Sequence, residues 1–308
     1  MKKSVSEIEA IILALAAFTL WVLTDTTIKL VGQTGLPPWE VIAFLGLWMA
    51  GFLLLHGWWR GNVRSLWPRQ KGRQFVRACL DLGNNFGVVI ALRHLTLPLF
   101  YILIFLAPLA VTLESAWLLG ERLERRKVTA ILCGFAGVVI AVNPFGHARQ
   151  GDWKGYAACA VCVCCFSLSI VMSRRLTQTE SPESLTFFSG LVMAVTGFGL
   201  MLWHFAPMSA RVTGALCAMG LFCAVGSWCF FLAVKHAPAA TVSQYHYTQL
   251  PMGAVVAYVV WHDKPTAWMA AGGAVIVAAG MYIAVASSRK AFRGFPVPPV
   301  SDDAAAEP

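Results

Sequence analysis

Two ionisable side chains near the start of the chain are the first candidates for chemistry. Asp25 and Lys29 lie one helical turn apart within a long apolar stretch, with the acidic residue before the basic one, which is the order that favours an ion pair along a helix. Ionisable groups inside a bilayer are costly unless they are paired or hydrated, so they mark functional sites by default. We take Asp25 as a candidate substrate-binding residue, with a structural Asp25–Lys29 ion pair near the outer interface as the alternative.

A second group of polar residues follows helical spacing. Asp81, Asn84 and Asn85 stand at positions i, i+3 and i+4, which places three polar groups on one face of a helix. Lipid would leave these groups without hydrogen-bond partners, so the face must contact protein or water. We expect all three residues to line a substrate pathway.

Glu114 is a further carboxyl side chain inside an apolar stretch, and its expected depth is close to that of Asp81. One hypothesis is a structural pair in which Glu114 captures Arg77 or another loop arginine. The other is a pair of carboxyl groups, Asp81 and Glu114, one of them protonated as in a proton relay. The second hypothesis would couple substrate movement to protons.

A polar run precedes Pro251, at residues 244–249. On an α-helix Tyr245 and Gln249 share one face, and His246 is offset towards Gln249. The tyrosines alone would fit an aromatic belt at a membrane surface, but the amide and imidazole groups need polar partners. We expect Tyr245, His246 and Gln249 to line a cavity.

Two prolines and three large aromatic residues complete the candidate set. Pro108 and Pro251 lie inside apolar stretches, and a proline there frees a backbone carbonyl one turn earlier, so we expect a hinge at each. Trp21, Trp228 and Tyr101 could stack on a planar or aliphatic ligand, although such residues more often serve packing or the membrane interface.

The composition places these residues in an all-α integral membrane protein. Of the 308 residues, 58% are hydrophobic and 13% are charged, against about 25% charged residues in soluble domains. Apolar stretches repeatedly reach the roughly 20 residues that cross a bilayer as a helix. The net charge of +9 is spread over short loops rather than along one stripe, which argues against a nucleic-acid partner.

The nine cysteines predict neither a disulfide framework nor a metal site. Almost all of them lie inside apolar stretches. The group from Cys159 to Cys165 has a metal-like spacing, but on one helix its thiols point around most of the circumference. We interpret these cysteines as small buried apolar residues and expect no metal and no other cofactor.

The chain divides into ten predicted membrane-spanning helices. Their expected ranges are 8–31, 39–59, 79–92, 97–119, 128–142, 153–172, 185–205, 212–234, 239–261 and 266–287.

An interior proline, a short charged turn and a glycine-bearing helix occur twice along the chain. The distance from Pro108 to Glu121 is 13 residues, and that from Pro251 to Asp263 is 12 residues. We interpret this pattern as an internal repeat of five spans.

The repeat divides the chain at 8–143 and 152–287, followed by an expected disordered cytoplasmic tail at 288–308. Five spans bring the chain to the opposite side of the membrane, so the second repeat must be inverted, an architecture typical of secondary transporters. With ten spans, 18 of the 24 Lys and Arg residues fall on the side of the termini. The positive-inside rule therefore predicts that both termini are cytoplasmic.

The order and spacing of these motifs resemble the EamA type of the drug/metabolite transporter superfamily. The paired five-helix halves, the interior prolines and the Leu119-Gly120-Glu121 turn carry the resemblance over about residues 8–287. The resemblance implies ten helices around an aqueous cavity, alternating access and small polar substrates, often amino acids. The sequence departs from the family pattern at His262-Asp263, which replaces Gly-Glu, and around Gly46, where many members carry an arginine.

Together these interpretations predict a secondary transporter, not an enzyme, for a small polar metabolite in the bacterial inner membrane. Export of an amino acid or a derived compound fits best, because interior carboxylates can hold an ammonium group and amides a carboxylate. A metallophore exporter, a riboflavin-like vitamin importer and a homodimer remain open. An intramembrane enzyme or a channel is disfavoured, since no convergent nucleophile set and no filter segment occur. Without a Gly-x-x-x-x-Gly-Lys-[Ser/Thr] loop, ATP is not the direct energy source.

Overall fold

The computed structural model describes residues 2–119, 125–143, 151–176, 179–236 and 245–293, and these residues are nearly all helical. Six helices contain stretches that are long and apolar enough to cross a membrane: α1 (Lys2–Gly32), α2 (Pro38–Trp59), α3 (Lys71–His94), α7 (Trp153–Leu176), α8 (Pro182–Met201) and α9 (Ala210–His236). Further α-helices are α4 (Leu97–Ile104), α5 (Ala107–Leu119), α6 (Arg125–Val142), α11 (Gln249–Trp261) and α12 (Ala267–Arg293), with short 3₁₀ helices η1 (Val63–Leu66) and η2 (Tyr245–Thr248). The chain is a helical membrane protein, as its apolar composition predicts.

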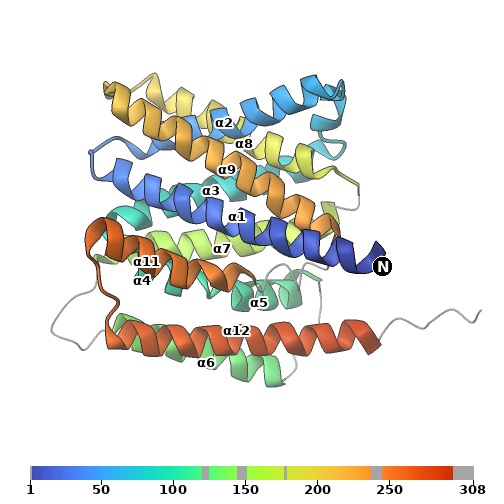
Figure 1. Cartoon of the computed structure of the whole chain (residues 1–308), viewed down its shortest axis with the longest axis vertical. Helices are drawn as coiled ribbons and strands as arrows, with labels where there is room; N and C mark the ends of the chain where they lie inside the picture. Colours follow the sequence, from blue (N-terminus) through green and yellow to red (C-terminus); the bar gives the residue numbers. More distant parts are fainter. Residues whose placement is uncertain (1, 120–124, 144–150, 177–178, 237–244, 294–308) are drawn as a thin grey trace, which may run out of the picture.

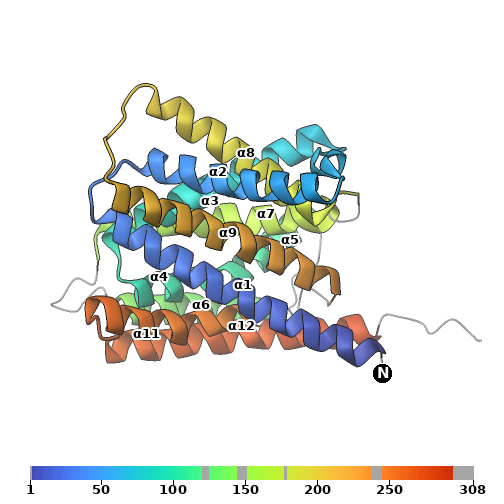
Figure 2. The ribbon, with the colours of Figure 1, turned by 45° about the horizontal axis from the view of Figure 1, so that its top comes forward.

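Each half of the chain packs mainly on the other half. The most extensive contacts join α2 to α8, α1 to α9, α3 to α7 and α6 to α12. In Figures 1 and 2 the helices lie in one bundle, with α6 and α12 together at its lower side. Neither half therefore buries its apolar surface alone.

The paired helices run antiparallel. At one end of the α2–α8 pair, Glu40 of α2 accepts a hydrogen bond from the amide of Ala206, which follows α8, at 2.6 Å. At the other end, Ser181, which caps α8, donates to the carbonyl of Ser65, which follows α2, at 3.0 Å. In the α3–α7 pair, Gly83 faces Cys165 and the later Gly87 faces the earlier Ala158. The start of each helix thus lies beside the end of its partner.

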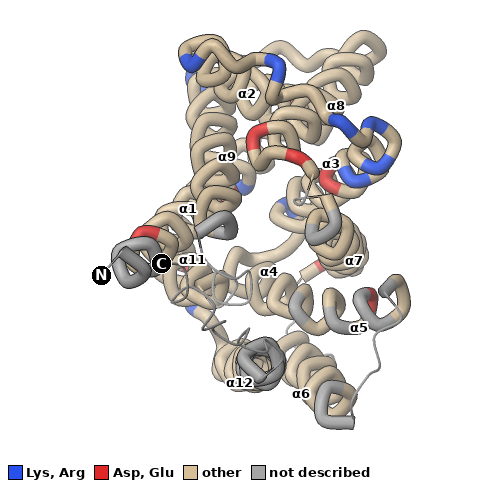
Figure 3. Tube along the Cα trace, turned by 90° about the vertical axis from the view of Figure 1, so that its right-hand side faces the viewer, with Lys and Arg blue, Asp and Glu red and all other residues tan. Residues whose placement is uncertain are grey.

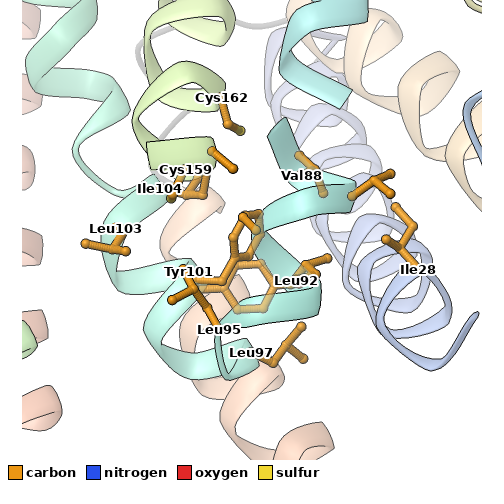
Figure 4. Close-up of a cluster of buried hydrophobic side chains, with 14 of the residues drawn as sticks. Ile28, Val88, Leu92, Leu95, Leu97, Tyr101, Leu103, Ile104, Cys159 and Cys162 are labelled. Atoms are coloured by element: carbon orange, nitrogen blue, oxygen red, sulfur yellow. The ribbon is translucent and has the colours of Figure 1, made fainter. Parts of the chain in front are cut away.

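The main hydrophobic core lies where the two halves meet. Buried residues of α1, α2, α3, α4, α7 and α9 form most of one cluster, which also includes one or two residues each of α5, α6, α8, α11 and α12. Figure 4 shows the part of this cluster around Tyr101 of α4, with Val88 and Leu92 of α3 and Cys159 and Cys162 of α7. Tyr101 is only 1% exposed, so its hydroxyl group must find a partner inside the bundle.

Two spans that we predicted as helices with an interior proline are interrupted. The span at 97–119 breaks at Phe105–Leu106 into α4 and α5, and Pro108 is the second residue of α5. In the span at 239–261 the described residues form η2 and then α11, in which Pro251 is the third residue. A proline in the first helical turn costs no hydrogen bond, because the first amide groups of a helix have no intrahelical partner.

Several predicted boundaries are wrong. Helix α3 begins at Lys71 rather than at 79, so Arg77, which we assigned to a loop, lies inside the helix. Helix α12 continues to Arg293, so residues 288–293 of the predicted tail are helical. The Gly120-Glu121 turn and residues 294–308 lie outside the described residues.

Basic residues gather at one end of the bundle. Figure 3 looks onto the end where α1 begins and α12 ends, and Lys and Arg residues cluster there beside α2, α3 and α8. Arg77 lies in α3 rather than in a loop, but the excess of Lys and Arg residues on the side of the termini remains when Arg77 is not counted.

Candidate functional site

Asp25 contacts Tyr101, which we expected to stack on a ligand. The hydroxyl group of Tyr101 in α4 donates a hydrogen bond to Oδ2 of Asp25 in α1, at 2.9 Å. Asp25 is partly accessible to solvent, whereas Tyr101 is buried. The contact joins the first helix of the bundle to the helix that precedes the break at Phe105–Leu106.

Lys29 is held away from Asp25. Its ammonium group donates to the carbonyl of Leu95 at 3.0 Å and lies 3.9 Å from the carboxylate of Asp263. The same nitrogen lies 5.0 Å from the centre of the Trp261 ring. The alternative of an Asp25–Lys29 ion pair is therefore wrong: Lys29 joins α1 to the turn after α11 instead.

Asp81 is saturated with hydrogen bonds. Ser169 of α7 donates to Oδ1 at 2.5 Å, and Ser189 of α8 donates to Oδ2 at 2.6 Å. Arg77, one turn earlier on α3, forms an ion pair with Oδ2 at 3.0 Å. The carboxylate thus ties three helices together.

Arg77 is buried, and its hydrogen bonds explain how α3 tolerates an arginine there. The Nη2 atom donates to the carbonyl of Leu185 at 2.5 Å and to Ser189 at 2.7 Å. Gln74 lies beside it, with its Oε1 atom 3.4 Å from Nε. Because Arg77 pairs with Asp81, the hypothesis of an Arg77–Glu114 pair is wrong. The sequence offered one signal for this clamp, the i, i+4 spacing of Arg77 and Asp81.

Asn84 and Asn85 face protein, as their spacing predicts. The thiol of Cys162 in α7 donates to Oδ1 of Asn84 at 2.9 Å. The amide of Asn85 donates to the carbonyl of Asp81 within α3, at 2.8 Å. Both asparagines keep partial solvent accessibility, so their remaining polar atoms are available to a ligand or to water.

Glu114 of α5 lies on a different side of α7 from Asp81. Its side chain forms a hydrogen bond with Ser167, whereas Asp81 accepts from Ser169. Side chains two positions apart on an α-helix, such as Ser167 and Ser169, point in nearly opposite directions. The structure therefore does not show the Asp81–Glu114 pair as directly bonded groups. The Oε2 atom of Glu114 is buried and has no partner among the described residues.

His246 and Gln249 lie together, as side chains three residues apart on a helix do. Residues Tyr245–Thr248 form a 3₁₀ helix, in which side chains three apart are eclipsed. The two side chains share a hydrogen bond, and Gln249 also donates to the carbonyl of Phe18 at 3.4 Å. The His246 ring stacks on Phe18 with centroids 5.1 Å apart, and Phe105 meets it edge-on at 5.4 Å. Both residues are buried and attach η2 to α1.

The aromatic candidates divide between two places. Trp21, partly exposed, packs against Phe18 and Phe230, and Tyr245 packs against the same small cluster. Trp228 lies elsewhere, 5.2 Å from His56 of α2 between ring centres. Trp21 and Tyr245 thus lie in the cluster around Phe18, on which His246 stacks. Trp228 belongs to a separate packing cluster.

Two surface grooves contain none of these residues. One, of about 480 Å³, lies between α6 and α12, and the other, of about 420 Å³, lies along the end of α2. Both are lined almost wholly by apolar side chains, which fits surfaces that face lipid.

The sequence matches the model of the EamA-like transporter family at residues 8–143 and again at residues 153–286. A relative named as a pseudopaline exporter, from Pseudomonas aeruginosa, is 27% identical over 86% of this chain and 92% of its own length. A riboflavin transporter of Rhizobium johnstonii is 27% identical over 59% of each chain. An S-adenosylmethionine uptake transporter of Rickettsia bellii is 23% identical over 61% of this chain and 63% of its own length.

A solved crystal structure shares the fold. It superposes with a TM-score of 0.64 at 21% identity, over 91% of this chain and 98% of that one. At this level of identity the likeness concerns the fold alone.

Proposed function

The chain belongs to the EamA-like transporter family, and we propose that it is a secondary transporter of a small polar metabolite across the bacterial inner membrane. One observation carries this proposal: the family model matches both halves of the chain, from residue 8 to 286. The relatives are transporters rather than enzymes.

We propose that the two halves are inverted repeats with ten spans in total. The packing supports this arrangement, because exchanging the halves maps the α1–α9 contact onto the α3–α7 contact and leaves α2–α8 and α6–α12 in place. A two-fold axis in the membrane plane produces this exchange. The glycine pair Gly46 and Gly190, 144 residues apart, lies at the α2–α8 crossing, where each is close to the other's carbonyl group.

The orientation that we propose has both termini in the cytoplasm. The basic residues at the end where α1 begins support it, since positive loops stay on the cytoplasmic side. Lys29 and Asp263 then lie at the periplasmic end, and Arg77 and Asp81 lie towards the cytoplasmic end.

The substrate pathway in this proposal runs between the halves, where α1, α3, α4 and α7 meet. Asp25 and Asn84 are partly accessible there, and Trp21, also partly accessible, packs against α9 one turn before Asp25. Asp81 supports the pathway wall rather than the ligand, because its oxygens already accept hydrogen bonds. The breaks near Pro108 and Pro251 give each half a place to bend, which alternating access requires.

For the cargo, we propose export of an amino acid or a compound derived from one. Central carboxylate and amide groups support a zwitterionic substrate, and the relative named as a pseudopaline exporter is similar over most of both chains. A vitamin importer is the second candidate, favoured by the relatives named as riboflavin transporters. In this proposal the two halves of a single chain build the substrate site.

We also propose protons as the coupling ion, with Glu114 as the group that binds them. Its Oε2 atom is buried and has no hydrogen-bond partner among the described residues, which supports this role, because carboxyl groups inside membrane spans commonly form proton relays.

The test is transport by the purified full-length protein in liposomes. Liposomes loaded with an unlabelled amino acid should take up the labelled form by counterflow, and empty liposomes or a heat-inactivated sample should not. Metabolite profiles of cells that overexpress or lack the protein would name the cargo. If the reconstituted protein moves no amino acid, amino-acid derivative or flavin, the proposed function is wrong.

A further inference from the structure

The ion pairs of the described residues leave the Asp25 carboxylate without a basic partner. Lys29 is paired with Asp263, and Arg77 is paired with Asp81. Asp25 accepts only the Tyr101 hydroxyl group through Oδ2, so its Oδ1 atom has no hydrogen-bond partner in the described part of the chain. A carboxylate inside a membrane protein needs a counter-charge or water, and its partial accessibility allows a mobile group to supply that charge.

An aromatic ring lies one turn away on the same helix face. Trp21 precedes Asp25 by four residues, so the two side chains are neighbours along α1. The indole lies against Gly226 of α9, and a methyl group placed there would come within 3.0 Å of its Cδ1 atom. The missing side chain at Gly226 therefore leaves room for the ring. An indole face beside a carboxylate favours an organic cation, through charge attraction and cation–π contact.

Tyr101 determines where the carboxylate points. Its ring packs directly on Gly253 of α11, so closely that a Cβ atom at this position would overlap the ring. The ring is thus confined between α11 and the core, and its hydroxyl group donates to Asp25. Fixing one oxygen in this way leaves the other free for a ligand.

The donor set also argues against an inorganic cation. Calcium takes six to eight oxygen ligands and magnesium demands octahedral geometry. The described groups that interact with Asp25 are the phenol hydroxyl group of Tyr101 and, electrostatically, the thiols of Cys162 and Cys223, and no cluster of three or more His, Cys, Asp or Glu side chains that could hold a metal occurs in the described part of the chain. This chemistry suits a protonated amine, which needs few hydrogen-bond acceptors and tolerates apolar walls.

We propose that Asp25 and Trp21 bind the protonated amine of the transported metabolite, and that Tyr101 is the positioning residue that orients Asp25. The proposal rests on the proposed transport function and adds the charge of its cargo. It excludes neutral and purely anionic compounds as preferred substrates.

The test uses the full-length protein in lipid nanodiscs and a matched panel of probes. The panel contains L-amino acids, the amines obtained by removing their carboxylates, and their N-acetylated forms, which lack the positive charge. Binding is measured as a rise in the thermal unfolding midpoint and transport as counterflow in liposomes. The variants are Asp25→Asn and Tyr101→Phe, with Glu9→Gln as the control, because Glu9 is an exposed carboxylate on the same helix.

We expect wild type and Glu9→Gln to bind at least one amine probe and to reject its N-acetylated form. Asp25→Asn should weaken amine binding by about tenfold or more, as expected for losing a charge-assisted hydrogen bond. Tyr101→Phe keeps the buried ring, so it should fold normally, bind the amine several-fold more weakly and discriminate less between the amine and its acetylated form.

Several outcomes would overturn the cation site. They are equal binding of N-acetylated probes, unchanged amine binding in a folded Asp25→Asn protein, and no stabilisation by any amine. If Asp25→Asn does not fold, unchanged affinity and selectivity in Tyr101→Phe also count against it. Transport separates the two proposals: counterflow of neutral probes by wild type and Asp25→Asn alike would retain the transporter and reject the site. Amine binding without counterflow would retain the cation site and reject the transporter.

Discussion

The Nη1 atom of Arg77 lies 3.0 Å from Oδ2 of Asp81, one turn further along α3. The arginine is 2% exposed, and both residues also bond with Ser189 of α8. An arginine whose charge and donors are satisfied in this way can lie inside a membrane helix. This pair therefore connects α3 to α8 as well as stabilising α3 itself.

Removing one member of this pair should destabilise the protein. Arg77→Met leaves a carboxylate without its counter-charge, which we expect to cost up to about 3 kcal/mol, since Asp81 keeps some contact with solvent. The double variant Arg77→Met/Asp81→Asn should be more stable than Arg77→Met alone. Thermal unfolding in detergent measures both, with Arg73→Gln as an exposed control. Equal stability of all variants would show that the pair has no structural role.

Close packing of α2 on α8 should not tolerate a side chain at Gly190. A Cβ atom there would lie 2.8 Å from the amide nitrogen of Ala50 and from Cβ of Met49. Backbone atoms must then move apart, so Gly190→Ala should lower stability by about 1–3 kcal/mol.

Gly199 provides the matched control on the same helix. Nothing lies within 4 Å of a Cβ atom placed there, so Gly199→Ala should be neutral or slightly stabilising. Thermal unfolding midpoints measure this difference, and that of Gly190→Ala should be lower than that of Gly199→Ala. Similar midpoints would mean that the two helices are less tightly packed than the structure shows.

Breaking the Lys29–Asp263 pair should open the end of the bundle that we assign to the periplasm. Lys29→Gln removes the ion pair at 3.9 Å and weakens the bond to Leu95. In a protein that keeps only Cys162, we expect a membrane-impermeant maleimide applied outside to react several-fold faster in this variant. Lys154→Gln, an exposed change, is the control. If the reaction rate of Cys162 is unchanged, contacts other than the Lys29–Asp263 pair keep this end closed.

Glu114→Gln should separate exchange from accumulation. The glutamine keeps the shape and the hydrogen bond with Ser167 but cannot titrate. We expect counterflow of the cargo to continue, whereas uphill transport driven by a proton gradient should fall to background. Persistent uphill transport in a stable Glu114→Gln protein would exclude this residue as the coupling group.

Single cysteines should reveal the orientation in the membrane. Arg64 and Lys264 are exposed, at opposite ends of the predicted spans. In intact cells an impermeant thiol reagent should label a cysteine at 264 and should label one at 64 only after the membrane is permeabilised. The reverse pattern would place the termini in the periplasm.

The sequence alone was sufficient for the membrane class and for the polar faces. Runs of apolar residues are long enough to require helices, because lipid offers no hydrogen bonds to the backbone. The spacing of Asp81, Asn84 and Asn85 indicates, for the same reason, one face of α3 that contacts protein or water rather than lipid. The transporter family followed from the order of motifs along the chain, and the match over both halves confirms it.

The partner of each polar side chain, by contrast, was decided only by tertiary structure. Lys29 pairs with Asp263 rather than with Asp25, and Arg77 pairs with Asp81 rather than with Glu114. Helical spacing shows which face a residue occupies, but its contacts depend on how two distant helices cross. At η2 the local geometry is also 3₁₀ rather than α, a difference that the sequence pattern did not indicate. Tyr101 reaches Asp25 because α4 ends just beyond it and Gly253 leaves space for its ring, a consequence of packing between segments about 75 to 150 residues apart in sequence.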